Sequence, residues 1–323
     1  MGNIMPPAAP WAGARIVNSS RLPHAIGHRG YRAAFPENTI ASFRGAVEVG
    51  ATVIEADIHL SKDGVVVLSH DATLKRCFGQ KAKISEYDWD YLSTLLTLRE
   101  PRQPMPRLID LLRYLARPTA EDIWLLVDIK TDDDATTLLT ALAAAIASVP
   151  ASKTPWNERI MLGSWVGWVE ACLRNLPSFP VALIAFSPDY ASAMLAVPNL
   201  NFNLFDYSFA TARGSKFKEK ARENSRLTFS WSDNKDQWMA LSIRDGVDGV
   251  ITDNPKRFMD LCEKWTSEEA SKSASRGTLP QSVLWLFINF LVWGTEIIST
   301  LLIGSPRRRV IKALSTQVLS VDD

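Results

Sequence analysis

The sequence predicts an α/β protein built as a (β/α)8 barrel (TIM barrel), with a small hairpin insertion and a C-terminal hydrophobic helix that anchors it to a membrane. Short β-rich apolar runs recur between residues 25 and 252, and helix-length segments separate most of them, as expected for βα units around a parallel sheet. A long apolar segment at 283–303 predicts the anchoring helix.

The candidate strands follow in order along the chain at 25–28, 52–58, 65–70, 123–129, 159–165, 181–186, 201–207, 227–231 and 246–252. Helical patterns lie between most of them, for example at 37–50 and 135–149. These runs are one more than an eight-stranded barrel needs. The connection between the second and third runs is too short for a parallel crossover, which indicates an antiparallel hairpin.

The hairpin turn carries an Asp-Gly pair, Asp63 and Gly64, which is a strong turn signal. If these two residues form the loop, pairing outward places Asp57 opposite His70. Glu55 lies two residues before Asp57 and therefore on the same face of the ribbon. The sequence thus predicts that three polar side chains converge, provided that the register does not slip by one residue.

Composition limits the classes of function. With 323 residues, 46% hydrophobic, the chain can form one large domain or two smaller ones. A net charge of +1 gives no field that would attract nucleic acid. Three separated cysteines indicate neither a disulfide framework nor a zinc site, and the N-terminus shows no secretory signal, so we expect a reducing, cytosolic setting.

The chain divides into segments by composition. We expect an N-terminal extension at 1–22, the barrel at 23–266, a polar linker at 267–280, the hydrophobic helix at 281–304 and a basic tail at 305–323.

Carboxylates at strand positions suggest a metal site. Glu55 and Asp57 supply hard oxygen ligands on one face of a strand, and Asp128 near the end of another strand supplies a third. Such a set suits Mg²⁺ or Ca²⁺. Lys130 shares the face of Asp128, so a solvated ion pair is the alternative interpretation of these two residues.

Two histidines fall in the same regions. His28 ends the first strand and is followed by Arg29, and His70 ends the hairpin, whereas His24 and His59 lack comparable neighbours and are expected to be structural. Two histidines beside a metal and an arginine fit phosphoryl chemistry, in which one histidine is the base, the other is the acid, and the arginine holds phosphate oxygens.

Three stretches carry a family resemblance: "GHRGYRAAFPENTIASF" at 27–43, "GATVIEADIHLSKDGVVVLSHD" at 50–71 and "GVDGVITDNP" at 246–255. Over about residues 25–261 the chain resembles the glycerophosphodiester phosphodiesterase family. The resemblance implies a (β/α)8 barrel, a divalent cation and cleavage of glycerol-linked phosphodiesters.

The resemblance also implies roles for individual residues. His28 and His70 match the acid–base histidines, Arg29 matches the phosphate-binding residue, and Glu55 and Asp57 match metal ligands. The following residues complete the implied site: Glu37 and Asn38 match the PEN motif near the metal and phosphate, Lys130 matches a lysine near the phosphate, and Trp231 matches an aromatic lining the glycerol pocket. Core packing is the alternative role for Trp231.

The chain departs from the family pattern at Asp128, where glutamate is usual. The stretches "LLVDIK" at 125–130 and "ERIMLGSW" at 158–165 resemble the fungal phosphatidylglycerol phospholipase C branch, where aspartate is expected. Because aspartate is one methylene shorter, its contact with a metal would be longer or water-mediated.

The segment Val283–Ile303 would span about 31 Å as a helix, close to the hydrocarbon thickness of a bilayer. Polar residues repeat along it at Ser282, Asn289 and Glu296, and a basic cluster follows it. A monotopic or re-entrant anchor with the catalytic domain in the cytosol is therefore expected first, a full span second and a buried soluble helix third.

These observations together predict a metal-dependent, membrane-associated enzyme that hydrolyses phosphatidylglycerol to diacylglycerol and glycerol phosphate. The endoplasmic reticulum, a lipid droplet or the mitochondrial surface would provide the membrane. A phosphodiesterase for soluble deacylated phospholipids is the first alternative, and a catalytically weakened membrane scaffold is the second.

Overall fold

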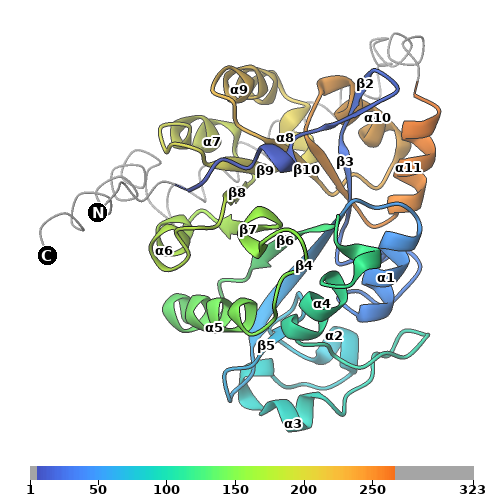
Figure 1. Cartoon of the computed structure of the whole chain (residues 1–323), viewed down its shortest axis with the longest axis vertical. Helices are drawn as coiled ribbons and strands as arrows, with labels where there is room; N and C mark the ends of the chain where they lie inside the picture. The colour runs from blue at the N-terminus through green and yellow to red at the C-terminus, as the bar shows by residue number, and fades with distance from the viewer. Residues whose placement is uncertain (1–5, 266–323) are drawn as a thin grey trace, which may run out of the picture.

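The structure, a computed structural model, describes residues 6–265, which form a closed barrel of parallel strands with helices around it (Figure 1). The eight parallel strands are β3 (His24–Gly27), β4 (Val53–Leu60), β6 (Trp124–Ile129), β7 (Ile160–Trp165), β8 (Val181–Ala185), β9 (Asn201–Phe205), β10 (Thr228–Trp231) and β11 (Gly249–Thr252). Each strand pairs with the next, and β11 pairs with β3. Each predicted barrel strand overlaps one of these, so the predicted barrel is confirmed.

Helices follow most of the strands and cover the barrel from outside. They are α1 (Ile40–Glu48), α4 (Leu108–Leu115), α5 (Ala135–Ala147), α6 (Val169–Asn175), α7 (Pro188–Met194), α8 (Asp206–Phe209), α9 (Ala212–Glu223), α10 (Asp236–Asp245) and α11 (Pro255–Glu263), with short 3-10 turns at Pro118–Ala120 and Trp156–Glu158. Local sequence sets their ends: the Asp134 carboxylate accepts a hydrogen bond from the Thr137 N–H at 2.9 Å and caps α5.

The predicted hairpin exists, but its predicted register is wrong by one residue. Strand β5 (Val66–Leu68) is antiparallel to the end of β4, and Leu60 pairs with Val66. The loop has three residues rather than two, because the Ser61 N–H donates to the Val65 carbonyl and Gly64 adopts a left-handed φ of 79°. Asp57 consequently lies opposite Ser69, and the Ser69 N–H donates to the Asp57 carbonyl at 3.1 Å.

The N-terminal extension closes one end of the barrel. Its 3-10 turn η1 (Pro10–Ala12) precedes a hairpin of β1 (Arg15–Val17) and β2 (Ser20–Leu22) that the sequence did not signal. Trp11 packs edge-to-face on Trp124, the first residue of β6, with ring centroids 5.3 Å apart. Because Trp124 begins its strand, the extension covers the N-terminal end, and the C-terminal ends of the strands form the opposite mouth.

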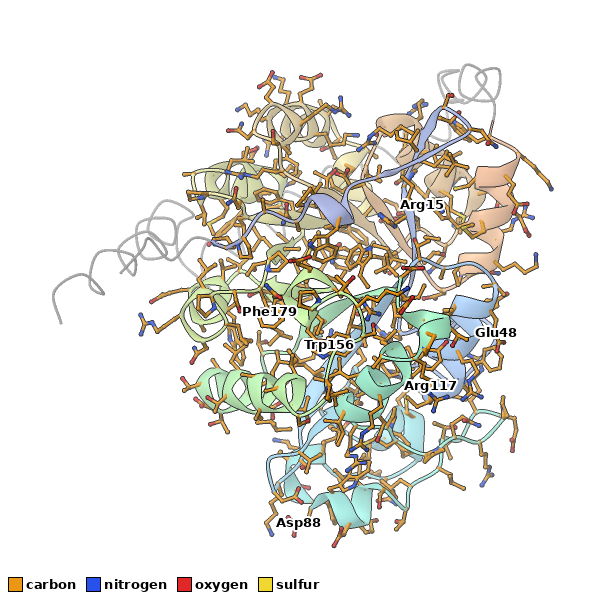
Figure 2. All side chains as sticks on the ribbon, viewed as in Figure 1. Arg15, Glu48, Asp88, Arg117, Trp156 and Phe179 are labelled. Atoms are coloured by element: carbon orange, nitrogen blue, oxygen red, sulfur yellow. The ribbon has the colours of Figure 1, made fainter. Side chains whose placement is uncertain are left out.

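A separate segment between β5 and α4 projects from one side of the barrel, in cyan in Figure 1. It contains α2 (Lys75–Phe78), η2 (Ile84–Glu86) and α3 (Trp89–Leu92), and Figure 2 shows Asp88 at its outer edge. It packs against β5 around a small separate apolar core, built on Val67, Leu74, Ile84, Leu92, Leu95 and Met105.

The membrane prediction concerns a part of the chain that the structure does not describe. The predicted linker, hydrophobic helix and basic tail at 267–323 lie outside the described residues. Within residues 6–265, no helix combines the length and apolar character needed to cross a bilayer.

Candidate active site

Three carboxylates converge at the C-terminal mouth of the barrel. Glu55 and Asp57 lie on β4, and Asp57 pairs in register with Asp128 on the neighbouring strand β6. One oxygen from each of the three side chains lies within 4.8 Å of the other two. Glu55 and Asp57 are almost fully buried, at 4% and 1% exposure. The predicted metal ligands are therefore brought together.

Two cations partly balance this charge. The Lys130 ammonium lies 2.6 Å from Asp57 Oδ1 and 2.5 Å from Asp128 Oδ2, and Arg29 Nε lies 3.1 Å from Asp57 Oδ2. Burial would raise the pKa of Asp57, but Lys130 and Arg29 bring it below its usual range. Lys130 is buried and the Asp128 side chain is only 13% exposed, so the two form one cluster with Asp57 and are not a solvated surface pair.

Glu55 has the least compensation of the three carboxylates. Its Oε2 accepts the Arg29 backbone N–H at 2.7 Å. Burial, followed by the charges of Asp57 and Asp128, raises the pKa of Glu55 well above its ordinary value. Hard carboxylate oxygens that are buried together and repel one another fit a divalent cation, which would supply the missing positive charge. Glu55, Asp57 and Asp128 are the residues that would hold it.

The two predicted acid–base histidines line the same pocket. His28 Nδ1 lies 2.6 Å from Asp253 Oδ1, and His70 Nδ1 lies 2.8 Å from Asp71 Oδ1. A carboxylate on Nδ1 favours a proton at that nitrogen and leaves Nε2 for chemistry in the pocket. His70 reaches the pocket although its register was mispredicted, because β5 ends at Leu68 and the chain leaves the pleat before His70.

The other two histidines serve the framework. His24 Nδ1 lies 2.8 Å from Thr52 Oγ1 and its Nε2 lies 2.9 Å from the Gly13 carbonyl. Burial lowers the pKa of His24 to about 4. His59 contacts Asp133 through Nδ1 and the His70 carbonyl through Nε2, so it supports the backbone at His70.

A tight turn after β3 places Arg29. Arg29 has a φ of 55° and Gly30 a φ of 83°, both in the left-handed region. A Cβ on Gly30 would lie 2.3 Å from Ser42 Oγ and 2.6 Å from the Ser42 backbone carbon, so any residue with a side chain would force this turn to shift. The Arg29 carbonyl accepts from Ser42 Oγ at 2.7 Å and from the Asn38 N–H at 3.0 Å.

The PEN residues have different contacts. Asn38 Nδ2 donates to Asp57 Oδ2 at 2.7 Å, so Asn38 orients a carboxylate of the metal cluster. Glu37 accepts from Arg29 Nη1 at 2.8 Å and also contacts Arg32 and Arg76. Although burial would raise its pKa, Arg76 and Arg29 lower the pKa of Glu37 to about 2.

The pocket has one polar and one aromatic side. Its volume is about 240 Å³, and its polar side comes from the first strands and the hairpin. The aromatic side is formed by Trp165, Phe186 and Trp231. The centroid of the Trp231 ring lies 6.1 Å from that of Trp165 and 5.2 Å from that of Phe186. Trp231 is therefore part of the pocket wall, and its Nε1 donates to the Asn203 carbonyl at 3.1 Å.

Sequence reasoning missed several contributors. Asp71 directly follows His70, and Asp253 directly follows the predicted strand at 246–252. Both lie in stretches that carry the family resemblance, but no pattern in the sequence indicated a role for either. Trp165 ends a predicted strand, which could have indicated a position at the mouth; its Nε1 donates to Asp128 Oδ1 at 3.1 Å. Arg76 carried no signal, because it is itself exposed and its partner Glu37 lies 39 positions away in the sequence.

Comparison with known proteins gives consistent matches. A glycerophosphodiester phosphodiesterase of Caldanaerobacter subterraneus is 24% identical over 245 residues, which cover 74% of this chain and 97% of that protein. The human protein named lysophospholipase D GDPD1 is 46% identical over only 61 residues, 19% of each chain.

Solved structures share the fold. A putative glycerophosphoryl diester phosphodiesterase of Silicibacter pomeroyi aligns with a TM-score of 0.68 at 19% identity, covering 79% of this chain and 98% of that one. An Oleispira antarctica phosphodiesterase, solved with sn-glycerol-3-phosphate, aligns with a TM-score of 0.64 at 16% identity, covering 75% and 98%.

The family assignment rests on the sequence match. Residues 28–257 match the Glycerophosphoryl diester phosphodiesterase family, whose enzymes are generally dependent on divalent metals. The relationship to the fungal phosphatidylglycerol phospholipase C branch stays a prediction. The chain belongs to the glycerophosphoryl diester phosphodiesterase family, and its members are phosphodiesterases.

Proposed function

We propose that this chain is a divalent-metal-dependent phosphoric diester hydrolase that cleaves glycerophosphodiesters, the soluble products of phospholipid deacylation. The observation that carries the proposal is the shared pocket: His28 and His70, each with a carboxylate on Nδ1, lie beside the carboxylate cluster of Glu55, Asp57 and Asp128. Paired acid–base groups around a cluster of carboxylates and cations suit phosphoryl transfer better than any other reaction class.

The side chains of the pocket have separate chemical roles. A divalent cation held by the carboxylate cluster would bring positive charge beside the phosphate. Arg29 and Lys130 line the pocket and offset the negative charge that develops on the phosphate oxygens. One histidine takes the proton of the attacking oxygen, from water or a substrate hydroxyl, as its bond to phosphorus forms. The other histidine gives its proton to the departing oxygen, so the alcohol leaves neutral.

The direct test is hydrolysis by the purified full chain. With Mg²⁺ or Ca²⁺ present, glycerophosphoglycerol should release glycerol phosphate, and chelation should stop the release. His28→Ala and His70→Ala should each lose at least about 100-fold in kcat while keeping the wild-type circular dichroism spectrum. Asp132→Asn, a change at an exposed carboxylate, is the matched control and should keep full activity. Release that persists in both histidine variants would refute the proposed roles.

Intact phosphatidylglycerol is a second candidate substrate. The aromatic side of the pocket, formed by Trp165, Phe186 and Trp231, offers apolar surface beside the phosphate site. The predicted hydrophobic helix would bring the enzyme to a membrane with its catalytic domain in the cytosol.

Vesicles and soluble diester separate the two candidates. Diacylglycerol released from phosphatidylglycerol vesicles, faster than glycerol phosphate from glycerophosphoglycerol at equal phosphodiester concentration, would favour the lipid substrate. Faster turnover of the soluble diester would favour the first proposal. The scaffold alternative predicts turnover of neither substrate with cation supplied. Pelleting with vesicles, compared between the full chain and a chain truncated after residue 265, tests membrane association.

A further inference from the structure

Building on the proposed hydrolase activity, we propose that Arg32 and Arg76 are positioning residues. Through their shared contact with Glu37 they fix the positions of the two acid–base histidines relative to each other. Neither arginine lines the pocket, and neither contacts the carboxylate cluster. Their contacts instead form a continuous chain of ion pairs that begins at one histidine and ends at the other.

The first half of the chain runs from the projecting segment. Arg76 in α2 binds Glu37 with both terminal nitrogens, at 2.7 and 2.8 Å. The same guanidinium binds Asp71 through Nε at 2.7 Å and through Nη2 at 3.0 Å. Asp71 Oδ1 in turn lies 2.8 Å from His70 Nδ1. A planar guanidinium that grips two carboxylates fixes both their distance and their orientation.

The second half runs through the loop after β3. Arg32 Nε donates to Glu37 Oε2 at 2.9 Å, and Arg32 Nη1 donates to Asp253 Oδ2 at 3.1 Å. Asp253 Oδ1 lies 2.6 Å from His28 Nδ1. Glu37 is therefore the common centre, and its side chain is only 9% exposed although the two arginines are about one-third and two-fifths exposed.

The chain of contacts also joins the phosphate-binding residue. Arg29 Nη1 donates to Glu37 Oε1 at 2.8 Å, so three guanidinium groups surround one carboxylate. Arg32 and Arg76 also contact the two carboxylates that lie on the histidines, and Arg29 also contacts Asp57. The three guanidinium groups stabilise the charge of the largely buried Glu37, which therefore suits the centre of the network.

Loss of either arginine should act on the histidine it supports. Within residues 6–265, the Asp71 side chain forms hydrogen bonds and ion pairs only with His70 and Arg76, so removing Arg76 leaves Asp71 freer to rotate away. The His70 ring then loses the partner that keeps its proton on Nδ1, and Nε2 is no longer fixed for proton transfer. Asp253 keeps a contact from Asn234 Nδ2 at 3.1 Å, so the effect of removing Arg32 should be smaller.

Steady-state kinetics of the full chain with saturating Mg²⁺ gives the first test. Arg76→Gln should lower kcat on glycerophosphoglycerol by about 10- to 100-fold with KM within threefold of wild type, and Arg32→Gln should lower kcat less. The double variant should lose less than the product of the two single losses, because both act through Glu37. Arg113→Gln is the matched control, since Arg113 is 62% exposed and lies 3.8 Å from its nearest carboxylate.

The leaving group gives a readout that a merely structural role would not move. A p-nitrophenyl phosphodiester releases a stable anion and needs little help from a general acid. The arginine variant that disturbs the general acid should therefore regain kcat on this substrate. The arginine variant that disturbs the general base should not. Equal losses for both variants on both substrates would overturn the proposal, as would kcat values within twofold of wild type.

A tautomer measurement tests the proposal even without turnover. In ¹⁵N-histidine spectra, Arg76→Gln should change the ring-nitrogen shifts of His70 and leave those of His24 unchanged. Wild-type His70 shifts in this variant would overturn the inference. Failure of the proposed function is distinguishable, because it would show as no hydrolysis by the wild-type chain while the tautomer change persists.

Discussion

Replacing Lys130 by methionine should destabilise the metal-free protein and strengthen its response to a divalent cation. The ammonium group lies 2.6 Å from Asp57 and 2.5 Å from Asp128, and its side chain is only 9% exposed. Without it, the three clustered carboxylates, two of them buried, retain Arg29 as their nearest cation. Removing one partner of a buried ion pair costs about 3–5 kcal/mol.

That loss corresponds to a fall in melting temperature of roughly 6–20 °C, at about 2–4 °C per kcal/mol for a domain of this size. Because Lys130 competes with the cation for Asp57 and Asp128, its loss should also tighten metal binding. A cation at 100 times its Kd stabilises a protein by about 2.7 kcal/mol, so added Mg²⁺ or Ca²⁺ should recover much of the lost stability. Turnover should nevertheless fall, since Lys130 lines the substrate pocket.

Thermal melts in chelator and across a cation titration provide the assay. Lys153→Met is the matched control: Lys153 is 80% exposed and pairs with Glu121, so its loss should not change the melting temperature measurably. The reasoning fails if Lys130→Met melts within 2 °C of wild type in chelator. It fails equally if the cation raises the melting temperatures of Lys130→Met and of the wild type by the same amount.

Three further changes test the pocket wall, the turn after β3 and a buried carboxyl group outside the pocket. Trp231→Ala should lower kcat/KM about 10-fold or more, mainly through KM, because it removes an aromatic wall of the pocket; a smaller loss in Trp231→Phe would separate packing from the Nε1 contact. Gly30→Ala should cost at least about 2 kcal/mol in urea unfolding, since its Cβ would meet Ser42 Oγ at 2.3 Å and its φ is 83°; wild-type stability would contradict the assigned constraint. Burial raises the pKa of Asp233 from 3.8 to about 7, so its protonated form stabilises the fold fully below pH 3.8, and this contribution is lost as pH rises through 7. Asp233→Asn should therefore gain stability relative to wild type between pH 4 and 8, and a pH-independent difference would argue against this pKa.

The barrel could be predicted because each strand is an apolar run in its own right. Residues 124–129 and 181–185 are buried along nearly their whole length, so composition alone marks them. The hairpin register depended instead on one residue in a loop: Ser61 pairs with Val65, and three residues turn the chain where an Asp-Gly pair suggests two. The N-terminal hairpin at 15–22 was missed because it is short and mostly exposed.

The site was predictable where a side chain has a fixed place on a strand. Glu55 and Asp57 share a face by the period of the strand, and the adjacent strand brings Asp128 level with Asp57. The supporting contacts are of another kind, because they join distant segments. Arg76 meets Glu37 across 39 positions, and His28 meets Asp253 across 225. No local pattern encodes such pairs; they follow only when the barrel closes.

The charges around the pocket favour the neutral form of His70, although Asp71 lies on its Nδ1. Burial lowers the pKa of His70, and Lys130 and Arg29 lower it further against the opposing effect of Asp57. A divalent cation at the carboxylate cluster would act in the same direction, because it adds positive charge. His70 is therefore the histidine that we expect to be neutral at pH 7 and to accept the first proton. With His70 as the base, the proposed mechanism leaves the role of acid to His28, and Arg32→Gln is then the variant whose loss the p-nitrophenyl substrate should relieve.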